Sequence, residues 1–244
     1  MKKLKKNVDT DKAGELLELT LEGINWRFRW CPAGTFTMGD DSGYATPHKV
    51  TLTRGFWLGE TQVTQEFWQA VMGKNPSYFK GAKLPVDRIS WNSCQEFIAK
   101  LNGLNAAPAD FTFSLPSEAQ WEYACRAGSK TAYCFGDDEK QLNDYGWYYG
   151  NSGIKTHPVG QKKANGWGLH DMHGNVWEWC LDWYGTYPND DVTDPSGVSS
   201  GIFRVLRGGC WYRNAGYCRS ASRYNYTPES SINFLGLRIA LVLQ

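Results

Sequence analysis

The chain has 244 residues, with 26 Lys and Arg against 25 Asp and Glu, and the two signs of charge are interspersed. This balance does not favour a protein dedicated to nucleic acid or to a membrane surface, since either would carry a basic face. No stretch approaches the roughly 18 apolar residues that cross a bilayer, so we expect no transmembrane segment. The 12 Trp and 26 Gly predict short elements and long ordered loops held by indole side chains.

The N-terminal stretch MKKLKKNVDTDKAGE begins with basic residues but lacks the apolar run of a signal peptide. We expect residues 1–15 to be flexible and residues 16–244 to form one domain, because no linker or internal repeat is visible. Localisation stays open at this point. The protein is cytoplasmic, or it lies on the cell surface if an export or lipoprotein signal has been removed from the sequence.

Seven cysteines are scattered along the chain without CxxC pairs. Their odd number excludes a disulfide framework that uses all of them, and their spacing does not favour a zinc site. We expect at least five of them to be free thiols of the core or of loops.

The first part of the chain alternates apolar and polar residues, as half-buried strands do. Alternation predicts a hairpin or two strands over 16–30, and a strand pair over 48–58 that is broken at Gly55. Between them, a turn at 32–34 leads into the segment 35–39.

Three helices are predicted next, and each starts with a local signal that apolar residues follow. The signal is a capping residue in the first two helices, and proline with acidic residues in the third. The first begins after Thr64 and ends at Gly73, and the second begins after Ser90. The third begins at 116–118 and ends before Gly128.

About seventy residues after Gly128 show no long periodic segment, yet they are rich in Trp and Tyr, which indicates ordered irregular structure rather than disorder. The C-terminal stretch 204–244 differs again. Its outer parts, 204–209 and 236–243, read as core strands and a tight turn. Its middle mixes Tyr, Asn, Ser, Arg and Gly without amphipathic order, which is the composition of a binding paratope.

Long motifs in series connect the chain to a known family: FTMG at 36–39, LPVDRISWNSCQEF at 84–97, LPSEAQWEYACRAG at 115–128, HPVGQKKANGWGLHDMHGNVWEWCLDWY at 157–184, and RVLRGG, CRSASR and GLRIA after residue 203. The sequence resembles the formylglycine-generating-enzyme (sulfatase-modifying factor) domain along nearly its whole length. The resemblance implies an α+β protein with a C-type-lectin-like fold: a small twisted antiparallel sheet, two to three helices and much ordered irregular structure.

Members of the family that this sequence resembles include copper-dependent oxidases, iron-dependent sulfoxide synthases and non-enzymatic binding domains, so the fold does not settle the function. The oxidases use two cysteines five residues apart near the C-terminus, since two thiolates hold a Cu(I) ion. The second position corresponds to Cys218, whereas the first is Arg213, which cannot ligate copper. The sulfoxide synthases need a histidine-rich helical domain before this one, and none of the 244 residues supplies it. His170 and His173 are expected to be loop surface residues rather than metal ligands.

The segment DMHGNVWE, which starts at Asp171, resembles a calcium-binding loop of the family. The implied ligands are the side chains of Asp171 and Glu178 and the carbonyl groups of Gly174 and Val176, and hard oxygen donors of this kind suit a structural Ca²⁺ ion. In the alternative interpretation the two carboxylates only tie the loop together by hydrogen bonds. No catalytic cofactor is expected.

The middle of the C-terminal stretch resembles the variable region of a diversity-generating-retroelement protein, in which mutagenesis at adenines rewrites binding positions on a lectin-like scaffold. Residues that match the family consensus alternate there with residue types that all arise by changing the adenines of an Asn codon. The predicted ligand-binding residues are Cys210, Tyr212, Arg213, Asn214, Gly216, Tyr217, Ser222, Tyr224, Asn225, Tyr226, Ser230, Ser231, Ile232, Asn233 and Phe234.

We therefore expect a non-enzymatic, receptor- or adhesin-like protein whose ligand is a macromolecule, with protein as the expected class and nucleic acid excluded. Two alternatives remain: a family domain whose active site has decayed, and an enzyme of the same fold, the copper-dependent formylglycine-generating oxidase above all.

Overall fold

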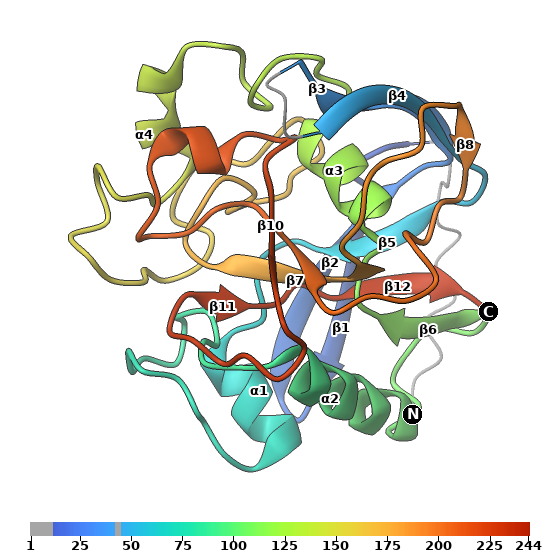
Figure 1. Cartoon of the computed structure of the whole chain (residues 1–244). Coiled ribbons are helices and arrows are strands. Elements are labelled where there is room, and N and C mark those ends of the chain that lie inside the picture. Colours follow the sequence, from blue (N-terminus) through green and yellow to red (C-terminus); the bar gives the residue numbers. More distant parts are fainter. Residues whose placement is uncertain (1–11, 42–44) are drawn as a thin grey trace.

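The computed structural model describes residues 12–41 and 45–244 (Figure 1). The segment expected to be flexible lies mostly outside these residues, but its last part is described. There, the Gly14 amide donates to the Trp30 carbonyl group, and the Trp30 amide donates to Glu15. Residues 14 and 15 are thus already held against the first sheet.

The first sheet combines both ends of the chain. Its five strands run in the order β1 (Leu16–Leu21), β2 (Ile24–Cys31), β5 (Phe56–Gly59), β12 (Ala240–Leu243) and β6 (Phe111–Ser114). All neighbours in this sheet are antiparallel. The last strand of the chain therefore lies inside the sheet, paired on both edges.

Two smaller sheets complete the strand structure. One has the order β10 (Arg223–Tyr226), β9 (Arg204–Arg207), β7 (Trp177–Trp183) and β11 (Leu235–Gly236), and the other has the order β3 (Gly34–Asp40), β4 (Ala45–Leu52) and β8 (Val192–Thr193). The expected antiparallel sheet is present as the first of three sheets, and each of the two smaller sheets also contains one parallel pair, β7–β11 and β4–β8.

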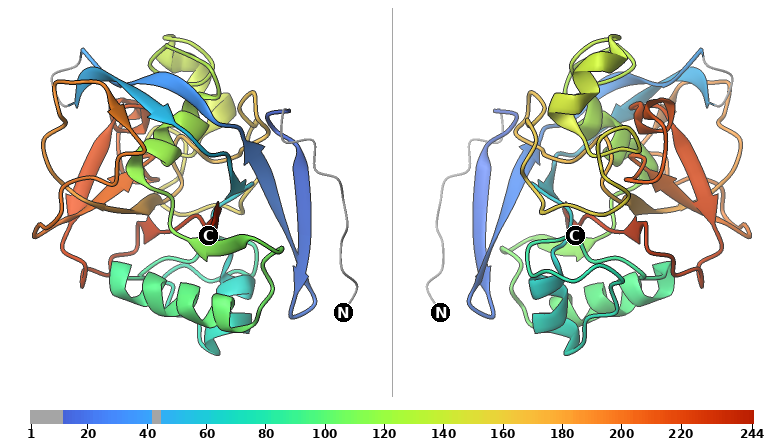
Figure 2. Two further views of the ribbon diagram at one scale, coloured as in Figure 1. Left: turned by 90° about the vertical axis from the view of Figure 1, so that its right-hand side faces the viewer. Right: turned by 90° about the vertical axis from the view of Figure 1, so that its left-hand side faces the viewer.

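The three predicted helices are present as α1 (Gln65–Met72), α2 (Trp91–Gly103) and α3 (Glu118–Arg126), and a short α4 (Leu142–Tyr145) is added to them. Thr64 and Ser90 cap α1 and α2, as the sequence predicted, and Ser117 caps α3 at the predicted start of that helix. As predicted, α3 ends before Gly128: its last residue is Arg126, and the residue after it, Ala127, adopts the left-handed conformation. Figures 1 and 2 show α1 and α2 together on one side of the strands and α3 on the other.

The hydrophobic core fills the space between these layers. On the side of α1 and α2, the Trp26 ring lies 4.2 Å from Phe67, and Trp68 stacks on Phe97 at 4.8 Å. On the other side, Trp121 of α3 is fully buried against a second apolar cluster. No described helix has the length and apolar character needed to cross a bilayer.

Candidate binding surface

The C-terminal segment leaves the sheet after β9 through a turn at Gly208 and Gly209, whose φ angles are +96° and +76°. A Cβ atom on Gly209 would lie 2.5 Å from the sulfur of Cys218, so only glycine fits there. The chain then forms a 3₁₀ turn, η2 (Ala215–Cys218), and returns as β10, which pairs with β9. The segment 208–226 therefore places many of the predicted binding residues at the β10 edge of the four-stranded sheet.

Hydrogen bonds to neighbouring loops fix the inward-facing side of the segment between β9 and β10. The indole nitrogen of Trp211 donates to the Asn233 carbonyl group at 3.1 Å, and the Tyr133 hydroxyl donates to the Ala215 carbonyl group at 3.0 Å. Nδ1 of His173 lies 2.8 Å from the Cys218 carbonyl oxygen. His173 is buried beneath the segment, so the expectation that it is a surface residue is corrected.

The outer side carries most of the predicted binding residues. Tyr212 and Tyr217 are 52% and 40% exposed, whereas Trp211 and Cys218 are 5% and 0% exposed. The exposed members are Tyr212, Asn214, Gly216, Tyr217 and Ser231. The partly buried members are Arg213, Ser222, Tyr224, Asn225, Tyr226, Ser230, Ile232, Asn233 and Phe234. The structure thus separates an inner set from an outer set along one short stretch of chain.

Cys210 departs from this pattern. Its side chain is fully buried in the main hydrophobic core. Burial raises the pKa of its thiol to about 12. We correct the expectation that Cys210 projects from the surface, since it belongs to the inner set.

An aromatic cluster surrounds one arginine on the outer side. The Arg213 guanidinium lies 5.0 Å from the centre of the Tyr217 ring and 5.2 Å from that of Tyr224. Tyr224 stacks on the buried Trp177 at 5.6 Å and also contacts Tyr226. Within the described part of the chain, no carboxylate pairs with Arg213. Aromatic rings and an unpaired arginine are the residue types that anchor protein interfaces.

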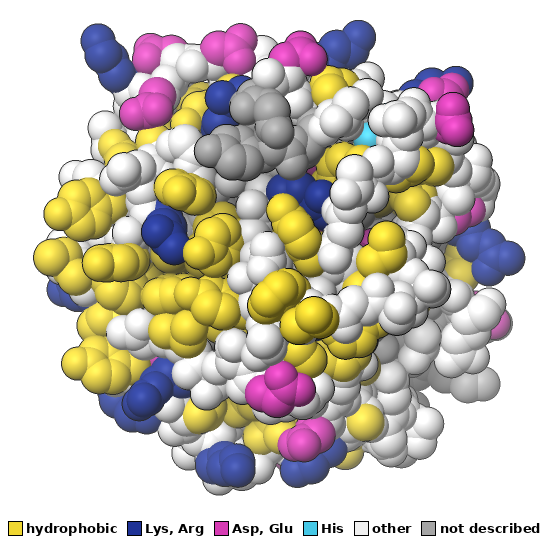
Figure 3. All heavy atoms as spheres, viewed as in Figure 1, with side chains coloured by type: hydrophobic (Ala, Val, Ile, Leu, Met, Phe, Trp, Pro, Cys, Tyr) yellow, Lys and Arg dark blue, Asp and Glu magenta, His cyan; other side chains and the backbone are white. Residues whose placement is uncertain are grey.

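Tyr149, which comes from another loop, extends this surface. Tyr78 and Ile154 are two further exposed side chains of loops, and none of the three was among the predicted binding residues; each is more than half exposed. The ring of Tyr149 lies 6.5 Å from Tyr212, and its amide donates to the Arg213 carbonyl group. Figure 3 shows hydrophobic side chains gathered, with Lys and Arg among them, on the side where these loops meet the C-terminal segment. In the sequence, only the dense aromatic composition of the loop 145–149 pointed to Tyr149.

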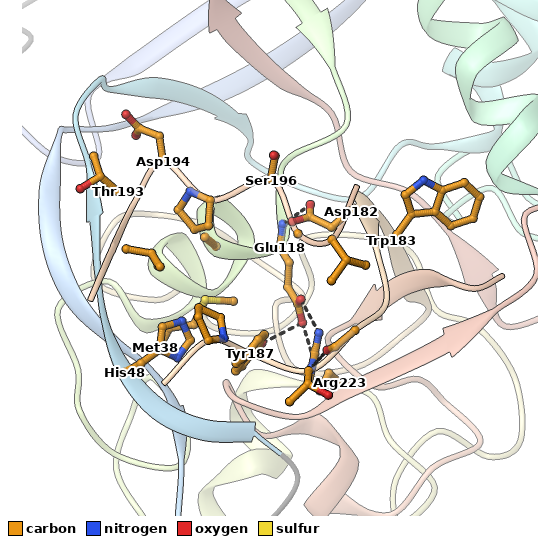
Figure 4. Close-up of a pocket in the computed structure, with 18 of the residues that line it drawn as sticks. Met38, His48, Glu118, Asp182, Trp183, Tyr187, Thr193, Asp194, Ser196 and Arg223 are labelled. Atoms are coloured by element: carbon orange, nitrogen blue, oxygen red, sulfur yellow. Dashed lines mark hydrogen bonds and ion pairs between the residues drawn. The ribbon is translucent and has the colours of Figure 1, made fainter. Parts of the chain in front are cut away.

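A buried ionic network supports β9 and β10 from below. Arg223 forms two hydrogen bonds to Glu118, at 2.7 and 2.8 Å, and the Tyr187 hydroxyl donates to the same carboxylate. Arg207 pairs with the buried Glu122. Figure 4 shows Glu118 between Arg223 and Tyr187 in the wall of a cavity of ≈ 710 Å³. The charged groups neutralise one another, so we assign this network to support of the strands.

Three of the four predicted calcium ligands surround one point, but a protein group already lies there. The fourth, the Asp171 carboxylate, accepts a hydrogen bond from the Gly160 amide instead. The side-chain nitrogen of Gln62 is 3.1 Å from the carbonyl oxygens of Gly174 and Val176 and 3.0 Å from Oε1 of Glu178. It is also 3.5 Å from the backbone oxygen of Asp171. In this arrangement the residues do not fit a cation, because the amide nitrogen takes the position that the ion would need.

The thiols near the C-terminus do not form the oxidase pair. Arg213 stands at the first position, on the outer side of the segment, while Cys218 is fully buried. Burial raises the pKa of Cys218 well above its usual value, which favours the thiol over the thiolate that copper requires. All seven cysteines are described, and all are free.

The fold and these motifs define the class of protein. Residues 27–243 match the sulfatase-modifying factor enzyme 1-like domain, and the chain belongs to this family. The resemblance inferred from the sequence, including the C-type-lectin-like fold, is confirmed.

Among solved structures, the chain is similar to variable protein 1 of Treponema denticola, with a TM-score of 0.87 and 34% identity over 92% of this chain and 98% of that one. It is also similar to PvdO of Pseudomonas aeruginosa, with a TM-score of 0.81 and 27% identity over 95% and 99% of the two chains. The similarity to a variable protein agrees with the inner and outer sets of the C-terminal segment.

Enzymes of the family are related as well. The formylglycine-generating enzyme of Streptomyces coelicolor is 36% identical over 64% of this chain and 52% of its own length. That of Mus musculus is 31% identical over 79% and 53%. The chain therefore spans about half the length of these two enzymes.

Proposed function

We propose that the protein is a non-enzymatic receptor whose diversified C-terminal surface binds another protein. The observation that carries the proposal is the alternation of buried and exposed side chains between Trp211 and Ala221. There, Trp211, Ala215 and Cys218 point inward, while Tyr212 and Tyr217 point outward. Substitutions at the outward positions change the surface without disturbing the core.

The similarity to a protein named as variable supports this proposal over the enzymatic alternative. The expected partner is a protein, because Tyr side chains supply rigid contact area and Arg213 supplies a charged hydrogen-bond donor. Display on the bacterial cell surface would suit such a receptor, and it remains part of the proposal.

Two libraries on the same chain test the proposal. One randomises the outward residues Tyr212, Arg213, Asn214, Gly216 and Tyr217, and its matched control randomises the inward residues Trp211, Ala215, Cys218, Ser220 and Ala221. We expect most members of the first library to display as folded protein and to yield binders to a chosen test protein. The control library should lose folded display, and equal loss in both libraries would contradict the proposal.

A genomic observation and a reaction address the alternatives. A near-copy of the final coding segment that differs at adenines, beside a reverse transcriptase gene, would support natural diversification. Incubation with Cu(I) and a cysteine peptide of the sulfatase type should yield no aldehyde, because Arg213 replaces the first thiol. Aldehyde formation would instead establish the oxidase.

A further inference from the structure

We infer that the side-chain amide of Gln62 takes the place of a structural cation and closes a cation site that the loop 171–178 would otherwise form. The inference is independent of the proposed binding function. It rests on the position of one buried nitrogen among four oxygens.

The geometry around Gln62 differs from an ordinary amide contact. Its nitrogen carries two hydrogens, yet four acceptor oxygens lie within 3.0–3.5 Å of it. Three of these are backbone carbonyl oxygens, and the fourth belongs to the Glu178 carboxylate. Convergent oxygens from an irregular loop form the donor set that hard cations take, and here they surround N–H groups instead.

The charge of Arg238 explains why a neutral amide, rather than a cation, can lie beside the Glu178 carboxylate. The Glu178 carboxylate accepts hydrogen bonds from Arg238 at both oxygens, each at 2.9 Å, and from Trp121 at 2.6 Å. Both Arg238 and Glu178 are fully buried. Because Arg238 already neutralises this carboxylate, a divalent ion is not required to balance it.

The backbone on either side holds Gln62 in place. The Gly59 amide donates to Ile239, the His170 amide donates to Glu60, and the Val63 amide donates to Leu237. Gln62 is 1% exposed, so its side chain has no open path to solvent. Two buried oxygens, Oε1 of Gln62 and Oδ1 of Asp171, accept no hydrogen bond from the described residues.

Thermal unfolding in calcium chloride and in EDTA tests the inference. The wild-type midpoint should be the same in both buffers. Gln62→Ala removes the donor, and Gln62→Glu replaces it with an acceptor among acceptors, so both should unfold roughly 5–10 °C lower in EDTA. Calcium should restore much of this loss, because each substitution opens the cation site.

Gln65→Ala is the matched control. Gln65 is equally buried, and its amide nitrogen donates to Phe79 and Pro85, away from the loop. This variant should lose stability equally in both buffers. Gln62→Asn, which withdraws the amide by one methylene group, gives a milder variant if the others fail to fold.

Three results would overturn the inference. Calcium could raise the wild-type midpoint, in which case Gln62 is a ligand or a bystander rather than a substitute for the ion. Calcium could fail to rescue every Gln62 variant, which would mean that the oxygens do not form a site. Calcium could also stabilise Gln65→Ala as strongly as the Gln62 variants, which would make the effect non-specific.

Discussion

At the scale of single residues, the tyrosines of the outer set are not equivalent. Tyr212 and Tyr217 are exposed, while Tyr224 stacks on Trp177 and packs against the main core. We expect Tyr212→Ala and Tyr217→Ala to change the free energy of unfolding by less than about 0.5 kcal/mol. Tyr224→Ala should cost roughly 1–3 kcal/mol, because a stacked and partly buried ring is lost. Urea unfolding of the three variants measures this contrast, and equal losses would contradict it.

Asp182 gives a prediction about pH. It accepts a hydrogen bond from the Glu118 amide, and burial, followed by the charge of Glu118, raises its pKa to about 7 from 3.8. Between these values the unfolded chain releases a proton that the folded protein retains. The contribution of Asp182 to stability is therefore fully present below about pH 4 and falls as pH rises to about 7.

Asp182→Asn cannot ionise, so the stability of this variant relative to wild type should rise by at least about 1 kcal/mol across that window. Urea unfolding at several pH values measures the difference. Asp190→Asn, at an exposed position of the loop that follows β7, is the control. A difference that stays constant with pH would contradict the raised pKa.

At the scale of elements, Trp211 joins the outer segment to the loops beneath it. Its ring packs at 5.5 Å from Phe79, and its indole nitrogen donates to Asn233. Trp211→Ala should destabilise the protein by roughly 3–5 kcal/mol, because a buried ring and a hydrogen bond are both lost. Trp211→Phe, which keeps a ring, should cost less. A mild effect of the alanine variant in thermal unfolding would reverse the assignment of inner and outer residues.

The sequence predicted elements best where a local signal existed. The caps at Thr64 and Ser90 and the proline and acidic residues at 116–118 identified three helices, and alternation identified the N-terminal strands. The strand β7 was missed because its apolar and polar alternation breaks at Cys180 and Leu181, and the polar Glu178 is buried with its neighbours. The contact between Tyr149 and Tyr212 could not be predicted either, since it depends on where two irregular loops meet.

The predicted calcium ligands illustrate the same limit. A family motif predicted oxygen ligands in the loop from Asp171 to Glu178, and the structure places three of them, from Gly174, Val176 and Glu178, around the Gln62 nitrogen. Gln62 lies more than a hundred positions earlier and belongs to no ligand motif. The position of Gln62 at the centre of the loop depends on the tertiary structure, so the sequence did not predict it.

At the scale of the whole molecule, the C-terminal segment that we propose to be diversified is enclosed by strands of two different sheets. β9 precedes it, and β12 follows it between β5 and β6. Ending the chain after Gly236 should therefore prevent folding rather than merely remove a tail, because the first sheet loses a central strand. Circular dichroism and gel filtration test this expectation. Removal of Gln244 alone is the control, and a folded product of the longer truncation would contradict the prediction.

This enclosure sets a rule for how the surface can evolve. Antibody loops vary in length because their ends rest on a frame that is complete without them. Here, an added or deleted residue between β9 and β12 has to be absorbed before Leu235, or it shifts the pairing of the strands that follow and turns their side chains to the wrong face. Exchange of one residue for another leaves that pairing untouched. We therefore expect this surface to diversify by substitution, with the number of residues between β9 and β12 kept constant.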